Sequence, residues 1–203
     1  ETGSPCIRYG EIYTTHDFVI KKFHSFISDD TAKESKEIAF GDLLFAGSGE
    51  TLEEIGKCVA YIGNDKAYAG GDIIIFSPTD EIDTAFLSFL LHTDYVCRQK
   101  RRIGQGHSVV HIYSSDIANI QVAIPTHLEQ VKISKTFSIW DKAIEKTESL
   151  IVAKEQLKKG LMQQLLSGKK RLLGFKGEWK KVRIGEVVKE VKRPIEWDDD
   201  KLY

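Results

Sequence analysis

The longest regular pattern of apolar and polar positions lies between residues 125 and 173. Apolar residues recur there at steps of three and four, which predicts one long amphipathic helix. Pro125 can stand just outside the helix N-terminus, and no proline or glycine follows it until Gly160. About 35 helical residues would extend about 50 Å at 1.5 Å per residue, too long for a small domain to bury. The segment is therefore predicted to need a partner helix.

On a heptad grid the apolar residues of this segment form an imperfect seam. One seam position holds Phe137, Ile144, Ile151 and Leu165, and the other holds Trp140, Thr147, Lys154 and Leu161. Because two members are polar, the seam does not specify a tight parallel zipper. The alternative is a helix folded against its own domain. The residues expected to pair with another helix are Phe137, Trp140, Ile144, Leu150, Ile151, Leu157, Leu161 and Leu165.

The same segment resembles one protein family. The motifs are Leu128-Glu129-Gln130 followed by Ile133, Trp140-Asp141 followed by Ile144, and the stretch from Leu157 through Gly160 and Gly168 to Leu172. They resemble the conserved spacer helix of the specificity (S) subunit of Type I restriction-modification enzymes. The resemblance implies an α+β fold, in which a globular α/β target-recognition domain is followed by a long helix that pairs in an antiparallel coiled coil.

The resemblance also divides the chain into three parts. Residues 1–127 are expected to form the target-recognition domain, and residues 128–168 the spacer or dimerisation helix. Residues 169–203 resemble the start of another recognition domain, with Trp179 and Gly185-Glu186 before a first strand. Either the chain is cut from a two-repeat subunit, or this tail folds back onto residues 1–127. The second arrangement is the preferred hypothesis.

Short apolar runs between turn residues predict strands in the first part of the chain. They cover residues 6–13, 41–46, 55–62 and 72–76, and a strand, turn and strand are expected over residues 111–124. Helical spacing predicts one helix from residue 83 to about residue 101. The charged residues 29–37 indicate an exposed turn or short helix. Together these elements predict a mixed domain.

The formal net charge of −1 hides an uneven distribution. Residues 1–127 hold 11 Lys and Arg against 18 Asp and Glu, a balance of −7. Residues 128–181 hold 13 against 6, a balance of +7. Any affinity of the first part for nucleic acid must therefore come from local clusters.

The dense cationic cluster of the first part comprises Arg98, Lys100, Arg101 and Arg102. Cations at a helix C-terminus favour the helix dipole, but that effect explains only one or two of the four charges. Arginine and glutamine contact base edges, and lysine and arginine hold phosphates, so the cluster favours DNA binding. Gln105 and His107 follow in a glycine-hinged loop that could enter a groove.

Other candidate DNA contacts are spread along the domain: Arg8, Tyr13, Ser48, Thr51, Lys57 and Tyr68. Ser48 and Thr51 belong to a Gly-Ser-Gly loop whose backbone amides could approach a phosphate. This loop lacks the pattern of a nucleotide site. The alternatives are a half-buried strand with one solvated arginine for Arg8, and a packed turn tyrosine for Tyr68.

No catalytic or metal-binding residues are predicted. The four prolines offer no adenine-methyltransferase motif, and matches to a nuclease acid-x-Lys pair arise by chance in a chain with 29% charged residues. Three widely spaced cysteines indicate buried apolar side chains. No apolar run approaches a membrane span and no signal peptide is apparent, so we expect a cytoplasmic protein.

The resemblance implies a non-catalytic subunit that recognises one half of a bipartite site in double-stranded DNA. It implies docking of methyltransferase (M) and restriction (R) subunits, with S-adenosylmethionine, Mg²⁺ and ATP on those partners and no cofactor in this chain. The helix would pair with a second copy or with a second repeat of the same subunit. The alternatives are a stand-alone sequence-specific DNA-binding protein and a coiled-coil adaptor without a DNA role.

Overall fold

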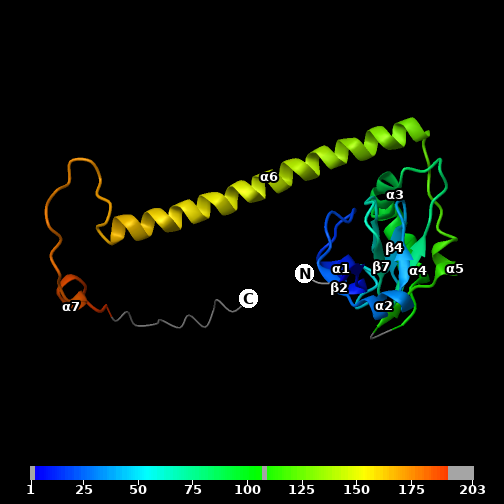
Figure 1. Ribbon diagram of the computed structural model, residues 1–203, viewed down its shortest axis with the longest axis horizontal. Coiled ribbons are helices and arrows are strands. Elements are labelled where there is room, and N and C mark those ends of the chain that lie inside the picture. The colour runs from blue at the N-terminus through cyan, green and yellow to red at the C-terminus, as the bar shows by residue number, and fades with distance from the viewer. Residues whose placement is uncertain (1–2, 107–108, 192–203) are drawn as a thin grey trace, which may run out of the picture. The chain divides into compact units, whose positions relative to one another are not determined.

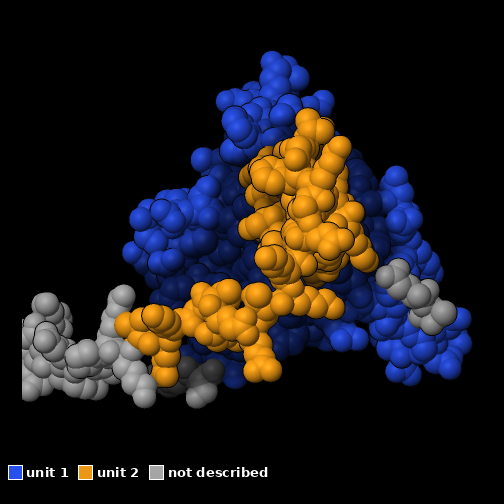
Figure 2. Space-filling model, turned by 90° about the vertical axis from the view of Figure 1, so that its left-hand side faces the viewer, with its two compact units in different colours: residues 1–143 blue, residues 144–203 orange. Residues whose placement is uncertain are grey.

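The computed structural model describes residues 3–106 and 109–191, and the chain divides into two compact units (Figure 2). Unit 1 covers residues 1–143 and unit 2 covers residues 144–203. Helix α6 (His127–Leu166) begins in the first unit and ends in the second (Figure 1).

Unit 1 is built on three small β-sheets. The first has the order β2-β1-β7-β3, formed by β2 (Ser25–Ile27), β1 (Ser4–Ile7), β7 (Ala67–Ala69) and β3 (Lys36–Ile38). The second has the order β6-β4-β8, formed by β6 (Cys58–Ala60), β4 (Leu43–Ala46) and β8 (Ile73–Phe76). The third pairs β5 (Ser48–Gly49) with β9 (Val110–His111). Among the strands of the described residues, only β1 and β7 pair in parallel.

Strand β4 separates two hydrophobic cores. Leu44 and Ala46 belong to one core, whereas Leu43 and Phe45 belong to the other, because successive side chains of a strand point to opposite faces. All four are buried, and β4 is paired on both edges. This double burial explains why the strand appears in the sequence as an unbroken apolar run.

Short helices cover the sheets of unit 1. They are α1 (Tyr9–Thr14), α2 (Asp29–Glu34), α3 (Thr84–Leu91), α4 (Asp94–Ile103) and α5 (Ser114–Ile117). The short exposed helix expected within residues 29–37 is α2, whose first turn is capped by the Ser28 hydroxyl accepting from Thr31 N. Asp83 caps α3 in the same way, accepting from Phe86 N at 2.7 Å.

Three sequence-based assignments are wrong. The sequence predicts that residues 8–13 continue a strand, but Glu11 accepts a bond from Arg8 N at 2.9 Å, a local capping contact that starts helix α1. The single helix over residues 83–101 is two helices, because His92 and Thr93 end α3 and begin α4.

The third error concerns residues 111–124. Beyond β9 this stretch, which the structure describes throughout, holds the short helix α5 and no further strand. At Gln121 the backbone N–H and C=O are both bonded to the Gln99 side chain, each at 2.9 Å. The polar groups that a strand would offer to a neighbour are therefore already paired.

His92, the residue that caps the end of α3, is expected to make the stability of the domain depend on pH. Its Nδ1 lies 2.8 Å from Ser88 O, its Nε2 is buried without a hydrogen-bond partner, and burial lowers its pKa from 6.5 to about 4. The unfolded chain therefore binds a proton at a higher pH than the folded chain does. We expect the free energy of unfolding to fall as the pH drops from about 6.5 to about 4, by at most about 3 kcal/mol from this group.

Urea unfolding of the wild type and of His92→Phe, at pH 7 and pH 4.5, measures this contribution. Phenylalanine suits the site because the His92 ring already packs edge-on against Phe18, with centroids 5.0 Å apart. The variant should lose less stability on acidification than the wild type. An identical loss in both proteins would show that His92 does not carry the effect.

The first turns of α6 are anchored on unit 1. Gln130 is 1% exposed; its Oε1 accepts from Asp83 N at 3.0 Å and its Nε2 donates to Pro125 O at 2.9 Å. The rings of Phe137 and Phe89 lie 5.0 Å apart. The helix start is thus fixed by a buried amide and an aromatic contact.

Unit 2 holds the rest of α6 and a mostly irregular segment. The segment contains one short helix, α7 (Ile184–Val187), which includes the Gly185-Glu186 pair expected to precede a first strand. Before it, Arg171 lies over the Trp179 ring at 5.2 Å and donates to Gly177 O at 2.8 Å. In the described parts of the chain, no helix has the length and apolar character required to cross a membrane.

Candidate nucleic-acid interface

A closed loop between β4 and β6 forms the centre of the candidate interface. Ala46 N donates to Lys57 O at 3.0 Å, so residues 47–56 leave the sheet and return to the same point. Gly47 and Ser48 are buried at the base, whereas residues 50–54 are exposed. The loop therefore presents a short polar tip on a fixed base.

Asp72 holds the base of this loop. Its backbone oxygen accepts from Gly47 N at 2.9 Å, and its carboxylate accepts from the Ser48 hydroxyl. A Cβ at position 47 would lie 2.8 Å from Asp72 Oδ1 and 3.1 Å from Asp72 O, so a larger residue there would displace the Asp72 carboxylate. Ser48 is consequently buried and bonded within the protein.

Tyr13 and Lys57 tie helix α1 to the loop. The Tyr13 hydroxyl donates to Ser48 O at 2.8 Å, and Lys57 Nζ donates to Tyr13 O at 3.1 Å. Burial, with smaller contributions from Glu54 and Asp72, raises the pKa of Tyr13 well above its usual value. The hydroxyl therefore stays a neutral donor, and both residues act inside the protein scaffold of the interface.

The cationic cluster on helix α4 is divided by the helix geometry. Arg98, Arg101 and Arg102 are exposed, but Lys100 is 3% exposed and its Nζ donates to Gly56 O at 3.0 Å. Successive residues of a helix point about 100° apart, so a cluster continuous in sequence has both outward and inward members. The placement of Lys100 on a DNA-contacting surface is therefore corrected.

The end of α4 is joined to the loop through β9. Gln105 N donates to His111 O at 2.9 Å, and His111 N donates to Gln105 O at 2.7 Å. His111 in turn pairs with Ser48 of β5. The backbone of Gln105 is thus connected to the loop through β9, and its side chain is exposed. His107 lies outside the described residues.

The remaining candidates fall in different places. Thr51 is exposed at the loop tip, and Arg8 is exposed at the start of α1. Tyr68 is only 9% exposed and packs with Cys6 and Ala32, so it is the packed tyrosine of the alternative interpretation.

Sequence reasoning missed the acidic character of the loop tip. Glu50, Glu53 and Glu54 are all exposed there. Glutamate can accept a hydrogen bond from cytosine N4 in the major groove, but it repels phosphates. The spacing Gly-Glu-Thr-Leu-Glu-Glu was the available signal. The affinity of this surface for DNA would consequently depend on the three exposed arginines.

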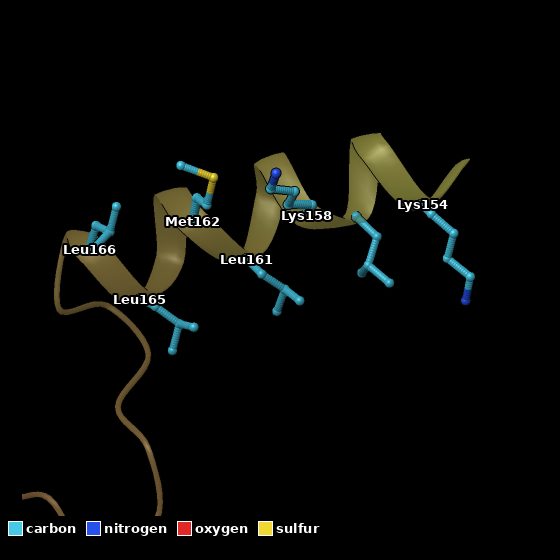
Figure 3. Close-up of a pocket in the computed structure, with 7 residues that line it drawn as sticks. Lys154, Lys158, Leu161, Met162, Leu165 and Leu166 are labelled. Carbon is cyan, nitrogen blue, oxygen red and sulfur yellow. The ribbon is translucent and has the colours of Figure 1, made fainter. Parts of the chain in front are cut away.

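A second exposed surface follows helix α6. Trp140 is 65% exposed, and Ile144, Leu150, Ile151 and Leu157 are also exposed. Near the helix end, Leu161 and Leu165 point to one side while Met162 and Leu166 project from another (Figure 3). With Lys154, Leu157 and Lys158, these residues line an apolar groove on the surface of the helix. Phe137 differs from these residues because its ring also packs within its own unit, against Phe89.

Comparison with known proteins gives a match to one family model and matches to solved structures. Residues 4–154 match the family model of the Type I restriction modification DNA specificity domain. Within the described residues, no group of three or more His, Cys, Asp or Glu side chains could hold a metal ion. A search among curated proteins finds no match to the chain.

Solved structures match over most of this chain. A crystal structure of the S subunit of a Type I restriction-modification system from M. genitalium has a TM-score of 0.51 and 18% identity, over 82% of this chain and 39% of that chain. A second solved chain, from work on complex assembly and conformational transition of the type I R-M system, has a TM-score of 0.51 and 15% identity, over 81% and 38% of the two chains. The chain therefore spans about two fifths of their length. These matches confirm the predicted α+β fold.

Proposed function

This chain belongs to the family of Type I restriction-modification DNA specificity domains, and on that basis we propose that it recognises one half of a bipartite site in double-stranded DNA. The family membership predicted from the spacer-helix motifs is confirmed. We further propose that the chain leaves the chemistry to partner subunits, which would carry S-adenosylmethionine, Mg²⁺ and ATP. Such a role would be exercised in the cytoplasm.

The observation that supports the DNA-binding proposal is that the helix carrying three exposed arginines is connected by hydrogen bonds to a closed polar loop. Arg98, Arg101 and Arg102 extend from α4, and the loop of residues 47–56 is bonded to the end of α4 through β9. Arginine supplies both phosphate contacts and bidentate contacts to guanine. Thr51, Gln105 and the loop glutamates would add side chains that distinguish base edges.

The proposed division of labour gives Tyr13, Ser48 and Lys57 a supporting role. Their polar groups are occupied by bonds within the protein, so they would hold the loop rather than touch DNA. Arg8 stays a candidate contact because it is exposed. The contact of His107 with DNA stays a prediction.

We propose that helix α6 pairs with a second α6, from another copy or from a second repeat of the same subunit. The exposed apolar residues of the helix support this proposal, because single exposed leucines are ordinary but a continuous stripe indicates a partner. An antiparallel pair of rigid helices would set the distance between two half-sites. Docking of M and R subunits belongs to the same proposal.

The proposed domain limits follow from these roles. Residues 1–127 would recognise DNA, residues 128–168 would form the spacer, and residues 169–203 would supply an opening segment to a recognition domain. The exposed apolar side chains of the tail, including Leu173, Phe175 and Ile184, support a packing role for it. Folding of this tail onto residues 1–127 stays a prediction.

Selection from a pool of random duplexes tests the proposed function. The chain, alone and mixed with a Type I M subunit, is incubated with the pool at about 0.15 M salt, and bound DNA is sequenced. We expect one recurring half-site, or two half-sites at a fixed spacing if α6 pairs. Enrichment by a chain that does not bind the M subunit would favour the stand-alone DNA-binding alternative, and no enrichment in either condition would favour the adaptor without a DNA role.

A further inference from the structure

Lys100 is a charged residue whose side chain is almost completely buried. It is 3% exposed, and its Nζ donates to Gly56 O at 3.0 Å. An ammonium group has three donors, and among the described residues no carboxylate forms an ion pair with this one. A buried cation with so little compensation is costly compared with an apolar side chain of the same size.

Gly56, the residue that Lys100 contacts, is constrained both in its backbone conformation and in its size. Gly56 has a φ of +66°, and a Cβ there would lie 3.2 Å from Lys100 Cδ and 3.2 Å from Ile112 Cδ1. The lysine stem therefore packs flat on the glycine while its ammonium reaches the glycine carbonyl. The loop ends at the next residue, Lys57, whose own ammonium bonds to Tyr13 O.

Lys100 in α4 and Gln105, two residues beyond the end of α4, together connect both ends of the loop to this part of the chain. Lys100 holds Gly56 at the end of the loop, and Gln105 holds His111, which pairs with Ser48 at its beginning. The exposed Arg101 and Arg102 lie between these two fastening points, in the last turn of α4. Movement of either end of the loop relative to α4 would break one of these bonds.

We propose that Lys100 is a positioning residue for DNA specificity: its buried ammonium fixes the loop of residues 47–56 against helix α4, so that loop and arginines meet the DNA as one rigid surface. This proposal rests on the proposed DNA-binding function. It assigns Lys100 no contact with DNA. An apolar residue at position 100 would avoid the cost of burying a charge, but it could not donate a hydrogen bond to the Gly56 carbonyl.

The test compares Lys100→Met with Arg101→Gln in the full chain, using the half-site from the selection and a scrambled duplex. Methionine keeps the stem and removes the ammonium. We expect Lys100→Met to lower the ratio of specific to non-specific affinity about tenfold, with non-specific affinity within about twofold of wild type. Its salt slope should be unchanged. Arg101→Gln should instead weaken binding to both duplexes and reduce the salt slope by about one.

Two further measurements separate positioning from general stabilisation. Lys100→Met should unfold within a few degrees of the wild type, because the removal of a poorly paired buried charge offsets the loss of the bond to Gly56 O. Amide hydrogen exchange should become about tenfold faster in residues 50–56 and stay unchanged in β4. If Lys100→Met does not fold, Lys100→Leu, which also removes the donor, replaces it in the same comparison.

The outcomes are distinct. A wild-type chain without sequence preference overturns the proposed function and this inference with it. A wild type with a preference that Lys100→Met retains overturns the positioning role alone. A salt slope reduced by about one in Lys100→Met shows a phosphate contact and likewise overturns it.

Discussion

Replacing Arg98, Arg101 and Arg102 together by glutamine is expected to lower the affinity of the chain for its proposed DNA half-site by about 100-fold or more at physiological salt. All three side chains are exposed on α4, and the loop that is bonded to the end of this helix carries three exposed glutamates at its tip. With the arginines gone, little would offset the repulsion between that tip and the phosphates. Fluorescence anisotropy on a labelled duplex, measured over a series of salt concentrations, checks the result. The salt slope should fall by about 0.9 for each phosphate that the variant no longer neutralises.

A variant with the same change in net charge controls for non-specific electrostatics. Lys33→Gln, Lys36→Gln and Lys66→Gln also remove three exposed cations from the first unit. They lie at α2, at β3 and before β7, around the sheet that contains Tyr68. This control should bind within a few-fold of the wild type. Equal losses in both triple variants would mean that α4 is not the binding surface.

Replacing Leu157 and Leu161 by glutamate is expected to raise the dissociation constant of self-association by about 100-fold or more. Both leucines are exposed on α6 and line its apolar groove, so a paired helix would have to bury two carboxylates. Glutamate is a good helix former, so the helix itself should persist. Light scattering over a dilution series, with circular dichroism of each protein, measures both properties.

Gln156→Glu with Gln163→Glu is the matched control for the helix. Both glutamines are exposed on α6, and at about 100° per residue they point away from the side that carries Leu157 and Leu161. The control adds the same charge and should associate like the wild type. A wild type that stays monomeric at every concentration, or leucine variants that still associate, would contradict pairing through this face.

The sequence predicted those elements that are specified by residues close to one another in the chain. The 3.6-residue spacing of apolar side chains marked α6, and its motifs led to the family that residues 4–154 match. Apolar runs marked β4 and β8, because a strand buried on both faces has few polar positions. Prediction failed at residues 8–13 and 111–124, where single side-chain contacts from Glu11 and Gln99 turned the backbone away from a strand.

The sequence by itself thus determined the class of fold, the long helix and the residues that make up the cationic cluster. Tertiary structure decided which members of that cluster face outward: Arg101 is exposed and Lys100 is buried, although they are neighbours in the chain. It also decided that Tyr13, Ser48 and Lys57 support one loop, through bonds between residues 35 and 44 positions apart. Periodicity reports only neighbours along the chain, whereas these contacts depend on how distant segments pack, and no local pattern encodes that.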